Sequence, residues 1–228
     1  MTEQPLFAKK RRHFPDPAGP TMDGIVAMGD DLTVETLFEA YSFGIFPWPH
    51  PELPCLWFCP DDRGVLDFSE LHISHSLKKF LRKTDFEITF NRAFSQVMAE
   101  CAHVPRPGQS GTWITPEILR AYLEFHKLGY AHSVECWSPG SRELVGGLYG
   151  VYVAGVFSGE SMFFKKSNAS KLCLIRLAER LQLSGLKWMD IQMVTGVTSQ
   201  LGGKYISKAE FLNRLKAAKR EARPLDFL

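Results

Sequence analysis

Residues 188–194 carry two polar side chains in an otherwise apolar run that predicts a β-strand. Side chains on a strand alternate between its faces, so Asp190 and Gln192 should point the same way, about 7 Å apart. The residues between and beside them, Met189, Ile191 and Met193, should point the other way. A carboxylate and a carboxamide in a water-poor pocket can hold and polarise an amine. Because burying such groups unpaired is costly, a hydrogen-bonded core pair and an edge strand facing water are the alternatives.

A second polar feature is Glu160, which lies near the end of another predicted strand, in the segment FSGESMF. Its carboxylate could neutralise a cationic substrate group or shape a turn. The nearby GGLYG at residues 146–150 lacks the lysine of a phosphate loop and does not open a helix. Close packing or a bulge within a sheet is the better interpretation.

Two tryptophans and one group of basic residues indicate a nucleic-acid partner. Trp48 and Trp113 lie in irregular segments rich in Gly and Pro, where an indole can stack on a base, a contact worth about 1–3 kcal/mol. Each could instead anchor its loop to the core. A basic cluster at Lys78, Lys79, Arg82 and Lys83 could bind phosphates or be a solvated helix face.

Composition describes a globular chain. Its 228 residues include 27 basic and 25 acidic side chains and are 45% apolar, which excludes a disordered chain. No apolar run approaches the roughly 20 residues of a membrane span. The first residues lack the apolar stretch of a secretory signal, so we expect a cytoplasmic location. The five cysteines are an odd number, and the Cys55/Cys59 pair lacks a second pair of zinc ligands, so we expect ordinary cysteines.

These residues must be positioned by two unequal parts, a small N-terminal domain (residues 1–64) and a larger domain (65–228), divided at a turn near residue 64. We predict a helix between Thr33 and Gly44, followed by an irregular segment with four prolines at residues 46–54. In the larger domain, the predicted helices are 74–82, 93–101, 116–128 and 170–181, and the predicted strands are 86–90, 131–137, 144–153, 155–163 and 188–194. This order implies an α+β or α/β fold with a crossover helix before the last strand.

Seven segments, in order along most of the chain, resemble the bacterial leucyl/phenylalanyl-tRNA–protein transferase family. They are GIVAMGDDLTVETLFEAYSFGIFPW, CPDDRGVL, GTWITPEILRAYLEFHKLGYAHSVECW, LVGGLYGV, GESMF, NASKLCLIRLAERL and MDIQMV. Short motifs such as FPW or GESMF are modest alone, but the segments together, in this order, are highly specific.

The resemblance implies an aminoacyltransferase (a leucyltransferase). Such an enzyme moves Leu or Phe, and also Met, from aminoacyl-tRNA to proteins with N-terminal Arg or Lys, marking them for N-end-rule degradation. It further implies an acetyltransferase-like (GNAT-type) larger domain with a mostly antiparallel mixed sheet. We expect no metal, no cofactor, no membrane partner and a monomer.

By the same resemblance, Asp190, Gln192 and Glu160 are catalytic, with Gln192 engaging the α-amine and Asp190 assisting as an orienter or weak base. Trp48 and Trp113 match tryptophans beside the 3′-terminal adenosine, and the cluster Lys78, Lys79, Arg82 and Lys83 matches the acceptor-stem patch. The pocket for the amino-acid side chain is lined by Leu148, Phe157, Met162, Leu174, Leu177, Leu181 and Met189. Met189 is included although strand alternation places it opposite Asp190.

The chain departs from the family pattern after residue 194. Where the family usually has His-Leu, this chain has Val197 and Thr198, and Lys208 replaces an Arg. Two other functions stay open from the sequence. An acyl-CoA-dependent N-acyltransferase would need a pyrophosphate loop that is not evident, and a non-catalytic tRNA-binding module would not need Asp190 with Gln192.

Overall fold

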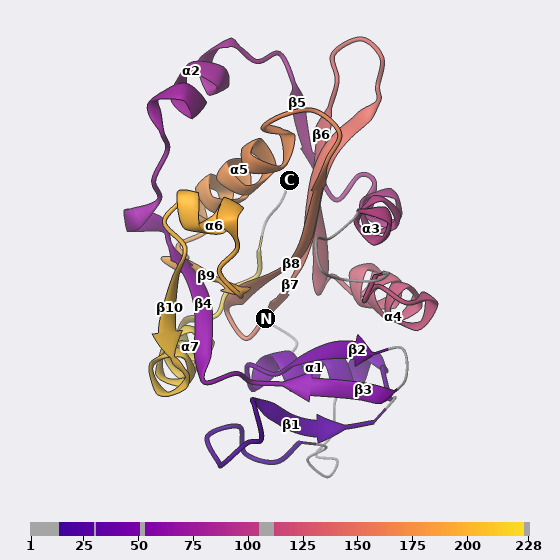
Figure 1. The fold of residues 1–228 in the computed structure, drawn as a ribbon, viewed down its shortest axis with the longest axis vertical. Coiled ribbons are helices and arrows are strands. Elements are labelled where there is room, and N and C mark those ends of the chain that lie inside the picture. The colour runs from indigo at the N-terminus through magenta and orange to yellow at the C-terminus, as the bar shows by residue number, and fades with distance from the viewer. Residues whose placement is uncertain (1–13, 30, 51–52, 105–111, 226–228) are drawn as a thin grey trace.

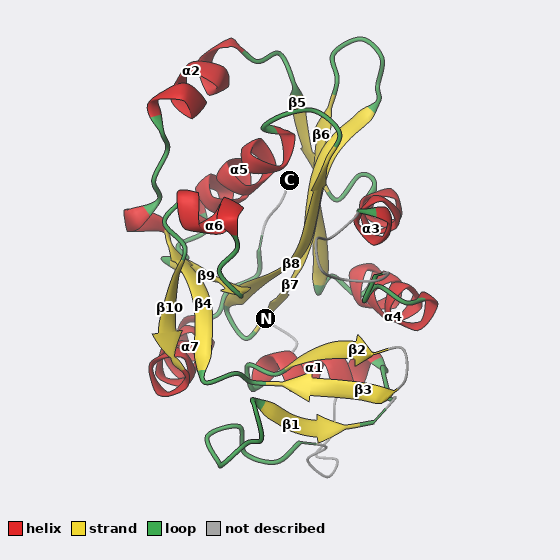
Figure 2. Ribbon diagram, viewed as in Figure 1, coloured by secondary structure: helices red, strands yellow, loops and turns green. Residues whose placement is uncertain are grey.

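The computed structural model describes residues 14–29, 31–50, 53–104 and 112–225. Two β-sheets dominate it, a three-stranded sheet near the N-terminus and a seven-stranded sheet that carries most of the helices (Figures 1 and 2).

The smaller sheet is antiparallel with the strand order β1-β3-β2. Its strands are β1 (Ile25–Met28), β2 (Phe46–His50) and β3 (Leu53–Phe58). Helix α1 (Val34–Ser42) begins at Thr33, whose hydroxyl accepts the Thr36 N–H, and the predicted helix is confirmed. The capping hydroxyl satisfies one backbone N–H that the first helical turn leaves unpaired.

The prediction of an irregular segment at residues 46–54 is wrong, because this stretch forms β2 and the start of β3. Proline lacks the N–H that a ladder needs, but it is tolerated where no partner strand requires that donor. Pro47 and Pro49 lie in β2, an edge strand. Pro54 precedes the part of β3 that pairs with β1, which begins at Leu56.

The larger sheet has the order β10-β4-β9-β8-β7-β6-β5 and is antiparallel except between β8 and β9. Its strands are β4 (Asp62–Asp67), β5 (Glu87–Phe90), β6 (Ala131–Trp137), β7 (Leu144–Val153), β8 (Val156–Phe164), β9 (Trp188–Gln192) and β10 (Lys204–Ser207). The predicted α+β class is confirmed, with a mostly antiparallel mixed sheet. The turn predicted near residue 64 is wrong, since β4 crosses that position. The division into domains at residue 64 stays a prediction.

Helices cover both faces of the larger sheet (Figure 1). They are α2 (His75–Lys83), α3 (Phe94–His103), α4 (Pro116–Lys127), α5 (Ala169–Leu183), α6 (Gly196–Gln200) and α7 (Lys208–Glu221), with a 3₁₀ turn at Phe68–Glu70. α3 and α4 pack on one face, and α5 packs on the other. α5 is the predicted crossover between the parallel strands β8 and β9, and α7 packs against β10, β4 and β8.

Close packing explains the glycines of β7. A Cβ on Gly146 would lie 2.5 Å from that of Ala169 in α5, and the β7–β8 register shifts at Gly150. The prediction of close packing or a bulge is therefore confirmed. All five cysteines are buried free thiols. No helix in the described residues has both the length and the apolar character to cross a bilayer.

Candidate active site

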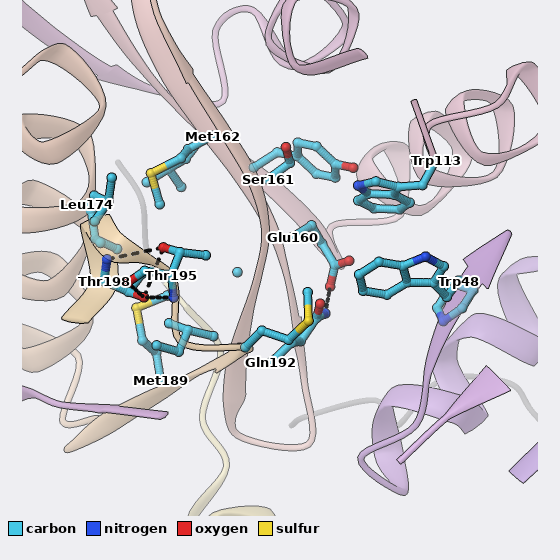
Figure 3. Close-up of a pocket in the computed structure, with 17 residues that line it drawn as sticks. Trp48, Trp113, Glu160, Ser161, Met162, Leu174, Met189, Gln192, Thr195 and Thr198 are labelled. Atoms are coloured by element: carbon cyan, nitrogen blue, oxygen red, sulfur yellow. Dashed lines mark hydrogen bonds between the residues drawn. The ribbon is translucent and has the colours of Figure 1, made fainter. Parts of the chain in front are cut away.

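A cavity of about 340 Å³ opens between the two sheets and the helix pair α5 and α6. Figure 3 shows the residues around it, with apolar side chains at one end, two indoles at the other and a carboxylate–carboxamide pair between them. It is lined by Pro47, Trp48, Trp113, Leu148, Tyr149, Gly159, Glu160, Ser161, Met162, Leu174, Met189, Ile191, Gln192, Met193, Thr195, Val197 and Thr198.

The apolar end is built by three elements. β8 contributes Met162, α5 contributes Leu174, and β9 contributes Met189 and Ile191. Neighbouring Val197 lies in α6, a single helical turn begun by a capping box between Thr195 and Thr198. Methionines adapt their shape to the group they contact, so this end suits an apolar side chain of variable form.

The polar centre is a hydrogen-bonded chain of four side chains. Glu160 Oε1 accepts hydrogen bonds from the Gln192 amide and from the Tyr41 hydroxyl, each at 2.8 Å. The Tyr41 and Tyr122 hydroxyls are also bonded to each other. Burial raises the pKa of Tyr41 and of Tyr122 well above the usual value, so both phenols stay protonated at neutral pH.

Glu160 has an unusual acidity for a carboxyl group. Desolvation raises its pKa to about 7, and the negative charge of Asp190 adds to this rise. The hydrogen bonds from Tyr41 and Gln192 and the charge of Arg63 oppose it. A carboxyl with a pKa near neutrality can accept and release a proton under working conditions.

Asp190 does not face the cavity, contrary to the expectation that it shares a face with Gln192. Its side chain is fully buried, and it is not among the residues that line the cavity. Its carboxylate binds Arg63 and accepts hydrogen bonds from Ser158 and from the Gln192 N–H. Asp190 is therefore a hydrogen-bonded group of the core, which was one of the alternatives from the sequence. Gln192 does line the cavity.

A break in strand geometry separates the two side chains. Gln192 ends β9 with φ of +58°, in the left-handed region, so the alternation of faces stops there. Its side chain therefore joins Met189, Ile191 and Met193 at the cavity, and the predicted opposition of these residues to Gln192 is wrong. Gly64, the register partner of Gln192, leaves space for the backbone of Met193, since a Cβ on Gly64 would lie 2.8 Å from it.

The two predicted tryptophans meet at the mouth of the cavity, one from β2 and one from the segment before α4. The centroids of Trp48 and Trp113 are 6.4 Å apart, with the ring planes at 26° (Figure 3). Both rings are half-buried and pack on the core while lining the cavity. They therefore anchor their segments and present an aromatic surface.

Other predicted residues lie outside the cavity. Phe157, Leu177 and Leu181 are buried in the core beside Leu148 and Leu174 but are not among the described lining residues. The four cations Lys78, Lys79, Arg82 and Lys83 are exposed on α2, away from the cavity. A second hollow joins α2 to the cavity helices, lined by His72, Ser74, Leu77, Lys171, Ser199, Gln200 and Leu201.

Sequence reasoning does not single out several residues of the site. Arg63 falls in the predicted turn near residue 64, although the apolar pair Val65-Leu66 directly after it is typical of a strand. Tyr41 fits the apolar stripe of its predicted helix, and Tyr122 carries no signal beyond a helical position. Among the described residues, no three His, Cys, Asp or Glu side chains gather as a metal site requires.

Comparisons with known proteins agree along most of the chain. A family model described as leucyl/phenylalanyl-tRNA protein transferase matches residues 65–216, and the model of its N-terminal domain matches residues 30–61. A leucyl/phenylalanyl-tRNA–protein transferase from Pseudoalteromonas atlantica is 48% identical, covering 92% of this chain and 89% of that protein. Its counterpart from Oleidesulfovibrio alaskensis is 44% identical, covering 94% and 88%.

Solved structures give more distant matches. L-PGS from Bacillus licheniformis has a TM-score of 0.40 at 14% identity, covering 78% of this chain and 67% of that one. A ribosomal-protein-alanine N-acetyltransferase from Brucella melitensis has a TM-score of 0.30 at 15% identity, covering 44% and 75%. The topology described above, and not these matches, carries the fold assignment.

Proposed function

The chain belongs to the leucyl/phenylalanyl-tRNA–protein transferase family, and we propose that its cavity is where an amino acid passes from tRNA to a protein. It is an aminoacyltransferase with aminoacyl-tRNA and protein substrates. In this proposal the apolar end receives the Leu, Phe or Met side chain. The polar centre, Glu160 with Gln192, receives the α-amine of the acceptor.

The reaction needs a neutral amine, an ester and a place for one proton. The amine nitrogen attacks the ester carbonyl, the new C–N bond forms, and the C–O bond to the terminal ribose breaks. Glu160 takes the proton that the amine loses and passes it to the departing ribose oxygen. A free α-amine has a pKa of about 7.7–8.0, so a base near neutrality suffices. Gln192 Oε1 accepts the second N–H and orients the nitrogen.

The single observation that carries this proposal is the order of groups along the cavity. An apolar slot, a carboxylate–carboxamide pair and two indoles follow one another over a short path (Figure 3). An aminoacylated RNA end presents an apolar side chain, an ester and a base in the same order. Holding the ester and the amine close together in the reactive orientation lowers the activation barrier, because it removes the entropic cost of their encounter.

The remaining parts of the substrate are assigned in the same proposal. Trp48 and Trp113 stack on the 3′-terminal adenosine, and α2 binds phosphates of the acceptor stem with its four cations. The hollow between α2 and the helices α5 and α6 supports this path, since both helices also line the cavity. Acceptors with N-terminal Arg or Lys and N-end-rule degradation complete the proposal and follow from the resemblance. A monomer and a cytoplasmic location are part of the same proposal.

The test is transfer by the purified full-length protein. Labelled leucyl-tRNA is incubated with a peptide bearing N-terminal Arg and with the same peptide N-acetylated, and label in each peptide is measured. We expect label only on the free amine. Leucyl-CoA in place of leucyl-tRNA should give none. Label on neither peptide, or equal transfer from the CoA ester, would contradict the proposal.

A further inference from the structure

We propose that Arg63 is a positioning residue for the transfer reaction, which holds Gln192 at the cavity through Asp190. This inference rests on the proposed function, because the task is part of the transfer reaction. Arg63 itself is not among the residues that line the cavity.

Arg63 of β4 and Asp190 of β9 form a buried ion pair. Arg63 Nε lies 2.8 Å from Asp190 Oδ1, and Nη2 lies 2.6 Å from Oδ2. Each side chain is 1% exposed. Two parallel hydrogen bonds fix the plane of the carboxylate as well as its position, which the single ammonium of a lysine cannot do.

Hydrogen bonds connect Asp190 to the cavity through Gln192. Asp190 Oδ1 also accepts the Gln192 backbone N–H at 2.9 Å, while Oδ2 accepts the Ser158 hydroxyl at 3.0 Å. The bonded N–H belongs to the residue with φ of +58°. The carboxylate thus holds the left-handed backbone that turns the Gln192 side chain toward Glu160, 2.8 Å away.

Two aromatic rings hold the Arg63 guanidinium in place. Its guanidinium lies between the rings of Phe46 in β2 and Phe211 in α7, 4.6 and 4.4 Å from their centroids. Its buried Nη1 has no hydrogen-bond partner in the described residues. Arg63 is therefore held by one carboxylate and two aromatic faces, drawn from three elements, so its orientation depends on all three.

Arg214 of α7 provides a control, because its side chain contacts both strands of this pair. Its Nη1 binds Asp67 of β4 at 2.8 Å, and its guanidinium lies 5.9 Å from the Trp188 ring of β9. It is partly exposed and also binds Glu210 of its own helix. Asp67 makes no described hydrogen bond to Gln192. Thermal unfolding of R63K and R214K shows how far each substitution weakens this pair of strands.

The experiment compares R63K, D190N, R63K/D190N and R214K as full-length proteins, with the transfer assay, tRNA binding and thermal unfolding measured for each. We expect kcat of R63K to fall by about tenfold to a hundredfold, with the Kd for tRNA changed less than about twofold. R63K should add nothing to the loss caused by D190N, because both act through one carboxylate. R214K should keep its kcat.

Three results would overturn the proposal: a kcat of R63K within about twofold of the wild type, independent losses from R63K and D190N, or an equal loss in R214K. If R63K does not fold, F211L decides, because it removes one aromatic face and leaves the ion pair. Reduced kcat with unchanged tRNA binding supports the proposal, and unchanged kcat overturns it. Inactive wild-type protein would instead contradict the proposed function.

Discussion

Two carboxylates near the cavity have opposite environments and therefore different tasks. Asp190 is held in the core by a guanidinium and two further hydrogen bonds, whereas Glu160 receives its direct hydrogen bonds from the neutral donors Tyr41 and Gln192. Desolvation raises the pKa of Glu160 to about 7. We therefore propose that Glu160 takes the proton in the transfer reaction, while Asp190 serves as the buried partner of Arg63.

The acidity of Glu160 predicts the pH dependence of transfer. Below pH 7 the carboxyl is protonated and cannot accept a proton, and the acceptor amine is charged. Both must lose a proton, so log kcat/KM should rise with a slope of about 2 between pH 5 and 7 in the wild type and about 1 in E160Q. Steady-state rates over that range measure both slopes. Equal slopes would remove Glu160 from the reaction.

The same pKa predicts how stability changes with pH. The folded state raises the pKa of Glu160 above its unfolded value, so it binds this proton more tightly than the unfolded chain. Glu160 therefore favours folding at acidic pH, and that contribution is lost as pH rises through about 7. Urea unfolding at pH 5 and pH 8 should show a smaller loss of stability in E160Q than in the wild type.

Leu174 should set the size of side chain that the apolar end accepts. L174F reduces the space in the cavity, which penalises phenylalanine more than leucine, and we expect the Leu/Phe ratio of kcat/KM to rise about tenfold. Competition between the two charged tRNAs measures this ratio. The control is L183F, at an 83% exposed position of the same helix, which should leave the ratio unchanged. A ratio unaffected by L174F would place the amino acid elsewhere.

At the scale of elements, α2 stands apart from the layers of the larger sheet (Figure 1). Ser74 caps it, and Leu77 is its buried residue, while its four cations face solvent. None of the four forms an ion pair within the described residues, in contrast to Lys165 and Lys204 elsewhere in the chain. A helix with unpaired cations on its exposed side is suited to a phosphate backbone.

Neutralising α2 should change the salt dependence of tRNA binding. Replacing Lys78, Lys79, Arg82 and Lys83 by glutamine should weaken binding, because fewer tRNA phosphates are then neutralised by the protein. The slope of log K against log salt should become shallower by about 0.7–0.9 for each such phosphate. Titrations at several salt concentrations give the slope.

The matched control replaces Lys216 and Arg220, two exposed cations of α7. This variant should keep the wild-type slope, because α7 lies well apart from α2, beyond β10 and β4 (Figure 1). An equal change per replaced cation in both variants would indicate a general charge effect and not a site on α2.

At the scale of the whole molecule, the turn after α1 packs against helix α7. Gly44, after α1, has φ of +74°, and a Cβ there would lie 2.5 Å from Phe211 Cε1. Phe211 in turn covers the guanidinium of Arg63. The contact between this turn and α7 therefore helps to position Arg63, the residue that orients Asp190.

G44A should destabilise the protein through two effects, and G129A separates them. Gly129 has φ of +80°, but a Cβ at this position would have nothing within 4 Å, so G129A carries only the backbone strain, about 1 kcal/mol. G44A adds the clash with Phe211, about 1–3 kcal/mol more. Urea unfolding of both variants measures the difference. Equal destabilisation would show that Phe211 moves aside without cost.

The elements with a clear repeat were predictable from sequence, because local spacing decides them. Helices α1 to α5 and the strands of the meander follow from apolar periods, caps and turn residues. The proline-rich strands β2 and β3 and the strand β4 were not predictable. β2 lies at a sheet edge, where proline is tolerated, and β3 pairs on both sides with β1 and β2. β4 is held between β9 and β10, which lie more than a hundred residues later in the chain.

The candidate site divides in the same way. By itself the sequence determined the residue types: Glu160, Gln192 and two tryptophans, in segments that resemble a transferase family. Only the tertiary structure decided that Asp190 lies behind the cavity wall and that Tyr41 belongs to the site. Strand alternation holds while backbone angles stay extended, and the left-handed angle at Gln192 is fixed by contacts with Asp190 and by the space at Gly64, which lies more than a hundred residues earlier.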